Sequence, residues 1–406
     1  MRLFSVRQEL VSRPLSDLAT EVGRQLDSLE LEVPHGPVAL TVGSRGIANL
    51  PTVIRAVGDW LRAHGAEPFI VPSMGSHNGA TAEGQREMVE SLGITEQAMG
   101  MPIRASMECV KLGTVATGDV WMDRYCYEAA GVLVINRVKL HTCFSGPVQS
   151  GLVKMMVVGM GKIRAAETFH SSPTPKMKDM LMEMGKCLLD SGKIWAGLAI
   201  LEDGFDETAE LHAVTGDSIL QREPQLLGQH REYFPRLPVD QINVLVVDSI
   251  GKTYSGTGMD TNVIARRGVP GFEDITKPQI EYIAALSLAE SSHGNALVVV
   301  LADFVTQRLR DAIDEQKTFI NAFTTGEMLR AKIPATLPSD EVLVEKLAER
   351  FGPQRWMFIP NTLRLDHLYV SEDLRREVEA HPQCQIDPEP VELTFRDGRH
   401  QLAFAN

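Results

Sequence analysis

Short apolar runs alternate with longer amphipathic segments along the first half of the chain. Val38–Val42 and Gly131–Ile135 have the length and β-branched content of buried strands, whereas Leu50–Ala63 has apolar residues near helical spacing. A further strand is expected at Pro68–Val71 and a further helix at Thr81–Leu92. This alternation predicts an α/β fold in which helices cover a mainly parallel sheet.

The pattern begins again in the second half, which predicts a second α/β domain. A polar, proline-containing stretch, Arg222–Asp240, separates the two halves, and strand-like residues resume at Ile242–Val247. The residues beyond that strand predict a helix at Lys277–Ala289 and a strand at Ala296–Leu301. Both halves are therefore expected to form mainly parallel sheets, with an active site in the cleft between the two domains.

The boundary is expected near residue 240, which gives an N-terminal domain of residues 1–240 and a smaller C-terminal domain of residues 241–406. A chain of 406 residues has room for two or three domains. The tail, Val391–Phe404, predicts a hairpin around Asp397-Gly398, and residues 391–406 could pack back on the first domain or on the second.

The charge balance excludes some classes of partner. The chain has 40 Lys and Arg against 53 Asp and Glu, a net charge of −13, which argues against nucleic acid and against anionic membranes. A small anionic substrate needs only local positive charge. Five cysteines without a C-x-x-C pair favour a reducing compartment. Together with the lack of a long apolar run, they predict a cytoplasmic protein; the oligomeric state is not predicted.

Three loops that follow predicted strands carry residues suited to binding and proton transfer. Gly43–Gly46 contains Arg45, the loop from residue 73 to 81 contains His77, and the loop from 136 to 142 contains His141. Because ligands bind beyond the carboxyl ends of parallel strands, these groups are expected at one edge of the sheet. The glycines and serines of the first two loops would let backbone N–H groups approach an anion, although such residues also form ordinary turns.

A lysine in an apolar segment is the other notable feature. Lys154 lies within the run from Ser150 to Lys162, and His170 follows sixteen residues later at the end of a predicted helix. An unpaired buried ammonium is costly, so Lys154 either extends to solvent or is a desolvated, nucleophilic amine. The chain has no H-E-x-x-H, G-x-S-x-G or P-loop motif.

In order and spacing, these segments resemble the lactate racemase family, whose members use a nickel-pincer nucleotide. The resemblance covers residues 38–170 and becomes faint beyond residue 240. The matching segments are Gly43-Ser44-Arg45 for the family's D-x-T-R, Gly75-Ser76-His77 for its G-T-H, Val138–His141 with Phe144-Ser145-Gly146 for its E-P-H…F-S-G, Ser150–Lys154 for its S-G-G-x-K, and His170 for its nickel-ligating histidine.

The resemblance implies a racemase or epimerase of a 2-hydroxy acid, an isomerase. Hydride would leave Cα to the nickel-pincer nucleotide and return to the opposite face of a planar 2-keto acid, while histidines move the hydroxyl proton. Enzymes of cofactor synthesis would be partners. The implied roles are acid–base catalysis by His77 and His141, covalent cofactor attachment by Lys154, nickel ligation by His170, cofactor binding by Ser44, Gly75 and Ser76, and substrate binding by Arg45, Arg266 and Arg267.

The chain also departs from the family pattern. Val42 stands where the family has an aspartate, so a partner for His77 is lost or supplied by another residue, and the interval from His141 to Lys154 is longer. The glycine-rich residues 255–260 match only loosely. Three alternatives follow: an enzyme of another reaction on the same cofactor, such as an epimerase of a longer hydroxy acid; a cofactor-free protein that binds a small anion; and a metal-dependent hydrolase using His77, His141 and His170.

Overall fold

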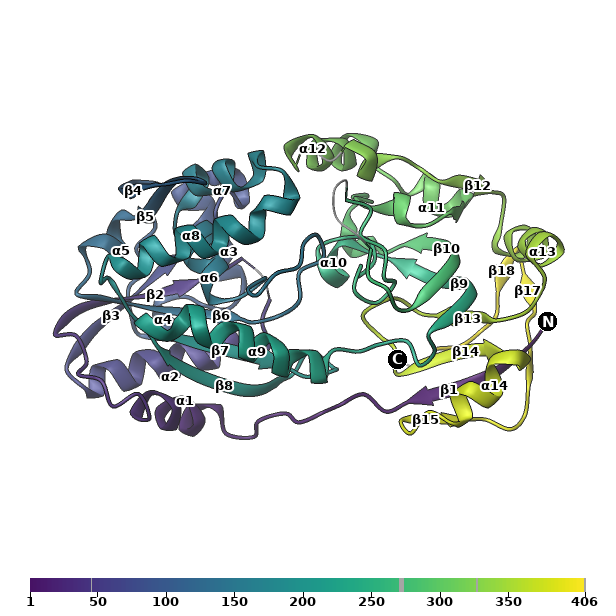
Figure 1. Ribbon diagram of the computed structural model, residues 1–406, viewed down its shortest axis with the longest axis horizontal. Coiled ribbons are helices and arrows are strands. Elements are labelled where there is room, and N and C mark those ends of the chain that lie inside the picture. Colours follow the sequence, from purple (N-terminus) through teal and green to yellow (C-terminus); the bar gives the residue numbers. More distant parts are fainter. Residues whose placement is uncertain (45, 270–273, 326–327, 405–406) are drawn as a thin grey trace. The chain divides into compact units, whose positions relative to one another are not determined.

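The computed structural model describes residues 1–44, 46–269, 274–325 and 328–404, and the chain divides into two compact units (Figure 1). The inner unit is Val11–Phe234, and the terminal unit combines Met1–Leu10 with Pro235–Asn406. Both units combine helices with sheets that contain neighbouring parallel strands, which confirms the predicted α/β class. The sheet of the inner unit is mainly parallel, whereas that of the terminal unit is mixed.

The division differs from the expected domains at two places. Strand β1 (Arg2–Gln8) pairs antiparallel with β14 (His367–Ser371) and β15 (Cys384–Ile386), so the first ten residues belong with the C-terminal half rather than with a 1–240 domain. The expected linker, Arg222–Asp240, is instead largely helical, because α9 extends over Ile219–Tyr233. The chain therefore passes from one unit to the other twice, after Leu10 and after Phe234.

The inner unit contains a five-stranded sheet in the order β3-β2-β6-β7-β8. The first four strands are parallel and β8 is antiparallel to β7. The structure confirms the strands expected in this half. The strand bounds are β2 Gly36–Val42, β3 Ala66–Pro72, β6 Gly131–Arg137, β7 Ile194–Glu202 and β8 Thr208–Thr215, with a separate antiparallel pair β4 Cys109–Val115 and β5 Gly118–Asp123.

Helices cover both faces of this sheet (Figure 1). Neighbouring residues of β7 point to opposite faces: Leu198 joins the cluster formed with α1 and α2, whereas a Cβ on Gly197 would lie 2.7 Å from Leu152 and 3.3 Å from Ile219. The helical segments are α1 Leu18–Asp27, α2 Leu50–Ala63, η1 Asn78–Ala80, α3 Ala82–Ser91, α4 Glu96–Met99, α5 Arg124–Glu128, α6 Leu152–Lys154, the π-turn η2 Met155–Gly159, α7 Lys162–Ser171, η3 Thr174–Lys176, α8 Met177–Asp190, η4 Gly216–Ser218 and α9.

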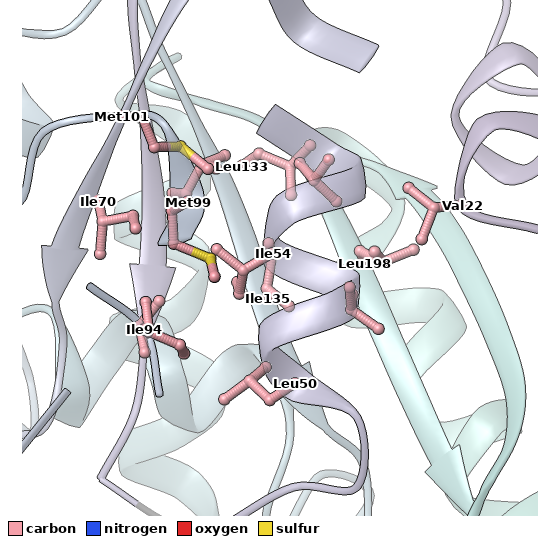
Figure 2. Packing of buried hydrophobic residues seen from close by; sticks show 14 of the residues in the cluster. Val22, Leu50, Ile54, Ile70, Ile94, Met99, Met101, Leu133, Ile135 and Leu198 are labelled. Carbon is pink, nitrogen blue, oxygen red and sulfur yellow. The ribbon is translucent and has the colours of Figure 1, made fainter. Parts of the chain in front are cut away.

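The core of the inner unit forms where the apolar stripe of α2 meets the sheet. Proline in the first turn of α2 suits a helix start, since that position needs no N–H donor. Leu50 and Ile54 of this stripe pack with Leu133, Ile135 and residues of neighbouring strands, as Figure 2 shows. The helical periodicity of Leu50–Ala63 thus predicts both the helix and the face that it buries.

The terminal unit has a larger, mixed sheet in the order β12-β11-β10-β9-β13-β14-β1-β15. The strands from β12 to β13 are parallel, and those from β13 to β15 are antiparallel. Its remaining strands are β9 Gln241–Ile250, β10 Gln279–Leu288, β11 Phe304–Thr306, β12 Ala335–Leu337, β13 Trp356–Ile359 and β16 Val391–Glu392, and its helical segments are α10 Lys252–Ser255, η5 Glu290–Ser292, η6 Val299–Leu301, α11 Gln307–Asp311, α12 Glu315–Thr325, η7 Met328–Ala331, α13 Asp340–Phe351 and α14 Glu372–Glu379.

Two predicted elements of this half are wrong. The segment expected as a helix, Lys277–Ala289, forms β10, which pairs along its whole length with β9. The segment expected as a strand, Ala296–Leu301, contains the short 3-10 turn η6, and the next strand is β11. A continuous apolar run suits either a buried strand or a buried helix, so periodicity alone cannot distinguish them.

The expected C-terminal hairpin is confirmed, with β17 (Phe395–Arg396) paired to β18 (Arg399–His400). Its turn residues Asp397 and Gly398 both have positive φ, 51° and 72°, as a type I′ turn requires. The tail packs within the terminal unit, where the Leu393 N–H donates to the Met1 carbonyl at 2.9 Å. Within the described residues, no helix combines the length and apolar character needed to cross a membrane.

Candidate functional site

Three parallel strands of the inner unit, β2, β3 and β6, end at one edge of the sheet, as the sequence predicts. The loops beyond them carry Ser44, His77 and His141. Arg45, expected to bind the substrate carboxylate, lies outside the described residues. The edge therefore brings together polar side chains from segments about a hundred residues apart.

His77 lies in the exposed loop after β3 and is held by the loop after β2. The Ser44 hydroxyl is hydrogen bonded to His77 Nδ1, so Ser44 supplies the ring with a partner where Val42 cannot. The His77 N–H donates to the Met74 carbonyl at 3.2 Å, and neighbouring Ser76 is exposed. A histidine fixed at Nδ1 presents its Nε2 for proton transfer.

Gly75 attaches the His77 loop to the segment that follows Lys154. Its N–H donates to the Gly159 carbonyl at 3.2 Å, and its own carbonyl accepts from Gln85 Nε2 at 2.8 Å. Gly75 has a φ of 63°, and an added Cβ would lie 3.3 Å from the Ala166 Cβ and 3.4 Å from the Val158 carbonyl oxygen. The loop needs glycine here because of both the positive φ and this close approach.

A fully buried lysine, Lys162, also holds the loop that carries His77. Lys162 Nζ forms an ion pair with Asp123 at 3.2 Å and donates to the Pro72 carbonyl and, at 3.1 Å, to Gln85 Oε1. Both charged side chains are completely buried. Burial raises the pKa of Asp123, while Lys162 opposes this effect. Lys162 thus links the end of β3 to the start of α7, the helix whose last turn carries His170.

The loop after β6 holds His141 in a defined orientation. Lys139 and Ser150 exchange backbone hydrogen bonds of 2.8 and 3.2 Å, which close the loop between them. Gln149 Oε1 accepts from the His141 N–H at 2.7 Å, and the ring of His141 contacts that of Phe144 with centroids 4.3 Å apart. The longer interval before Lys154 therefore forms a closed, internally hydrogen-bonded loop.

His141 and Lys154 are direct partners. The Cys143 N–H donates to His141 Nδ1 at 3.0 Å, so a neutral ring carries its hydrogen on Nε2. Nε2 lies 2.7 Å from Lys154 Nζ. A hydrogen on Nε2 can be donated to Nζ only when the lysine is an uncharged amine. The structure thus places the Lys154 amine beside the His141 ring, and whether this amine is the uncharged nucleophile expected from the sequence stays a prediction.

Lys154 lies where the α-helix α6 changes into the π-turn η2. The Met160 N–H donates to the Met155 carbonyl at 2.9 Å, five residues earlier, in a turn whose residues are all buried. Single π-turns inside helices are rare and often occur at functional sites. Lys154 itself is only partly buried, so its amine is held at the edge of an apolar segment rather than inside it.

His170, at the end of α7, lies in the same cluster. Burial and the positive charge of a protonated Lys154 lower the pKa of His170 to about 4. A row of ring contacts leads from His141 through Phe144 and Phe169 to His170, with centroids 4.3, 6.3 and 5.5 Å apart. His170 is therefore neutral near pH 7, the state in which an imidazole can bind a metal ion.

Arg266 and Arg267 belong to the terminal unit. The Arg266 guanidinium forms an ion pair with Asp303 at 2.7 Å and also donates to the carbonyls of Leu301, Ile280 and Glu281. Arg267 is buried and its N–H donates to Asp274 Oδ1 at 2.6 Å. These contacts support the backbone around β10, and a substrate contact by either arginine stays a prediction.

Three buried charged residues that support the site were not among those predicted from the sequence: Lys162, Asp123 and Glu223 of α9. One signal was present, because Glu223 shares a helical face with Ile219, Leu226 and His230, all of which are buried. A carboxylate on an apolar helix face predicts a buried partner. The described residues contain no group of three or more His, Cys, Asp or Glu side chains arranged to hold a metal ion, so the three histidines do not form a shared metal site there.

Comparisons with known proteins bear on the fold. No family model and no curated protein matches the sequence. Among solved structures, the chain is similar to the lactate racemase apoprotein from Thermoanaerobacterium thermosaccharolyticum, with 13% identity, 88% of this chain and 94% of that chain covered, and a TM-score of 0.50. A Northeast Structural Genomics Consortium structure of a Thermotoga maritima protein gives 12% identity, 80% and 83% coverage, and a TM-score of 0.50. The chain therefore has a lactate racemase-like α/β fold.

Proposed function

We propose that this chain is an isomerase that racemises or epimerises a 2-hydroxy acid with a nickel-pincer nucleotide attached to Lys154. The observation that carries the proposal is the contact between His141 Nε2 and Lys154 Nζ, 2.7 Å apart, in a fold like that of a lactate racemase apoprotein. His141 and Lys154, to which the resemblance assigns acid–base and anchoring roles, are neighbours in space. A binding module has no use for this set of histidines and lysine.

The side chains of Lys154 and His170 fit the proposed nickel-pincer nucleotide. Lys154 presents an amine that can be acylated, and His170 presents a neutral imidazole in the same cluster. Backbone groups around Ser44, Gly75 and Ser76 would hold the nucleotide phosphate at the strand ends. When bound, such a nucleotide supplies the acceptor and donor for the hydride that leaves and returns to Cα.

The side chains of the chain would carry the proton transfers. The hydroxyl group lies on different sides in the two enantiomers, so His77 and His141 would each serve one of them as general base and acid. Attachment turns the Lys154 amine into an amide-type nitrogen, which accepts hydrogen bonds poorly. His141 Nε2 would then face a substrate hydroxyl, and it would take the hydroxyl proton in the tautomer with its hydrogen on Nδ1, which gives up the Cys143 hydrogen bond. Ser44 keeps the ring of His77 oriented through Nδ1.

Intact mass and nickel content of the chain produced together with the cofactor-synthesis enzymes test the proposal. We expect wild type to gain the mass of one nucleotide and one nickel ion, Lys154→Ala to gain neither, and His170→Ala to lose nickel. Lys186→Ala is the matched control, because Lys186 is an exposed lysine of α8 paired with Asp190. Wild type that gains no mass in cells where a lactate racemase does contradicts the proposal.

The substrate is tested by incubating the loaded chain with single enantiomers of lactate and of longer 2-hydroxy acids, including sugar acids, and separating the products on a chiral column. We expect one member of this panel to be inverted, with His77→Ala and His141→Ala each lowering the rate by about a hundredfold or more. A loaded chain that oxidises a 2-hydroxy acid without inversion would favour another reaction on the same cofactor.

A further inference from the structure

A buried carboxyl group touches the start of the lysine helix. Glu223 of α9 is completely enclosed, and its Oε2 accepts a hydrogen bond from the Val153 N–H at 2.8 Å. Val153 directly precedes Lys154, in the first turn of α6, where backbone N–H groups have no partner inside the helix. Glu223 thus performs from another helix the capping that a neighbouring side chain usually provides.

The residues around this contact leave the backbone at the start of α6 little room to move. A Cβ on Gly151 would lie 2.3 Å from Glu223 Oε1, so the carboxyl group occupies the space that any other residue there would fill. The Gly151 carbonyl accepts from Asn136 Nδ2 at 2.8 Å, and Gly185 of α8 would place a Cβ 2.9 Å from the Val153 side chain. The first turn of α6 is therefore held from β6, α8 and α9 at once.

We infer that Glu223 is the positioning residue for Lys154: by binding the Val153 N–H, it sets where the lysine helix begins and so aligns Nζ with His141 Nε2. Its consequence for cofactor attachment rests on the proposed function, but the positioning itself concerns the free chain. Glu223 acts through the backbone and touches no reacting atom.

The chemistry of Glu223 agrees with this role. Burial raises the pKa of Glu223 to about 7, although the N–H groups of Val153 and Leu152 act in the opposite direction. The second carboxyl oxygen of Glu223, Oε1, has no hydrogen-bond partner among the described residues. A buried polar atom without a partner calls for an explanation, and a role in positioning Lys154 provides one.

Two variants of the free chain separate a positioning role from a general loss of stability. Glu223→Leu removes the acceptor, whereas Glu223→Gln keeps an oxygen for the Val153 N–H. Leu226→Ala is the control, because it loosens the same buried face of α9 without touching this bond. The readouts are hydrogen exchange at the Val153 amide and the rate at which acetic anhydride acetylates Lys154 relative to exposed Lys186. In that reaction Nζ forms an amide bond, and acetate and the amine proton leave.

We expect Glu223→Leu to speed exchange at Val153 about tenfold beyond any change in the β7 amides, because the side-chain acceptor of that N–H is lost. The ratio of Lys154 to Lys186 acetylation should fall at least about threefold, since Nζ loses its alignment with His141. For Glu223→Gln, the exchange rate at Val153 and the acetylation ratio should both stay within about twofold of wild type. Leu226→Ala should leave the acetylation ratio unchanged.

The inference is overturned if Glu223→Leu leaves exchange or the acetylation ratio at the wild-type value, if the ratio rises, or if Leu226→Ala changes both equally. These readouts need no cofactor. A wild-type chain that never gains a nucleotide would refute the proposed function and leave the positioning of Lys154 by Glu223 to be decided by exchange and acetylation alone.

Discussion

The Nζ atom of Lys154 lies 2.7 Å from the Nε2 atom of His141, and the other ring nitrogen of His141 accepts from the Cys143 N–H. In the tautomer that carries its hydrogen on Nε2, the ring donates toward the lysine, which then accepts with a lone pair. We predict that this relationship favours the uncharged, nucleophilic amine of Lys154 before any cofactor is present.

His141→Ala should lower the reactivity of Lys154 in the free chain. A single hydrogen bond contributes about 0.5–1.5 kcal/mol, so acetylation of Lys154 near pH 7 is expected to slow by about two- to tenfold. Pulse labelling followed by peptide mass spectrometry measures this rate. His64→Ala is the control, since His64 stacks on Trp60 at the end of α2. Equal rates in wild type and His141→Ala would show that the ring does not favour the neutral amine.

Asp123→Asn should destabilise the inner unit strongly. The change leaves the buried ammonium of Lys162 without its ion-pair partner, at a cost of about 3–5 kcal/mol. The asparagine can still accept from the N–H groups of Tyr125 and Cys126, so the cap of α5 is kept. Urea denaturation measures the free energy of unfolding. The double variant Asp123→Asn/Lys162→Met should recover part of the loss, and a single variant costing below about 1 kcal/mol would contradict a fully buried pair.

Two glycines of the His77 loop provide a matched pair of alanine variants. Gly75 and Gly79 both have positive φ, 63° and 74°, but only an added Cβ at Gly75 meets neighbours, while nothing lies within 4 Å of one at Gly79. Backbone strain should lower the free energy of unfolding of both variants by about 1 kcal/mol. Crowding against Val158 and Ala166 should lower that of Gly75→Ala by about 1–3 kcal/mol more. Thermal unfolding compares them. Equal losses of stability in the two variants would mean that the loop shifts to accommodate the added Cβ at Gly75 without cost.

Glu223 makes stability depend on pH. Burial raises the pKa of Glu223 from 4.5 to about 7, so its stabilising contribution is complete below about pH 4.5 and is lost as the pH rises through 7. At about 1.4 kcal/mol per pH unit, the loss is about 3 kcal/mol. Glu223→Gln does not titrate, so its free energy of unfolding should rise by this amount relative to wild type between pH 4.5 and pH 8.5. A difference that stays constant across this range would contradict the raised pKa.

Local periodicity was sufficient to predict most helices and strands of the inner unit, but it was insufficient for some elements of the terminal unit. Leu50–Ala63 has one apolar stripe, and only a helix can bury such a stripe on a sheet, so the sequence predicted α2 residue for residue. The segment that forms β10 has a short continuous apolar run, Tyr282–Leu286, which a helix could bury equally well. Pairing with β9 decides its structure, and that pairing joins residues about forty positions apart.

By itself, the sequence determined the α/β class, the strand exits that carry His77 and His141, and the order in which Lys154 and His170 follow them. These features depend on neighbouring residues and on the rule that parallel strands end at a common edge. Only the tertiary structure decided that His141 Nε2 meets Lys154 Nζ, that Ser44 serves His77, and that Glu223 and Lys162 hold the segments that carry these groups. The reason is physical: such contacts join residues 13 to 77 positions apart, and their partners are chosen by burial and packing rather than by any local pattern.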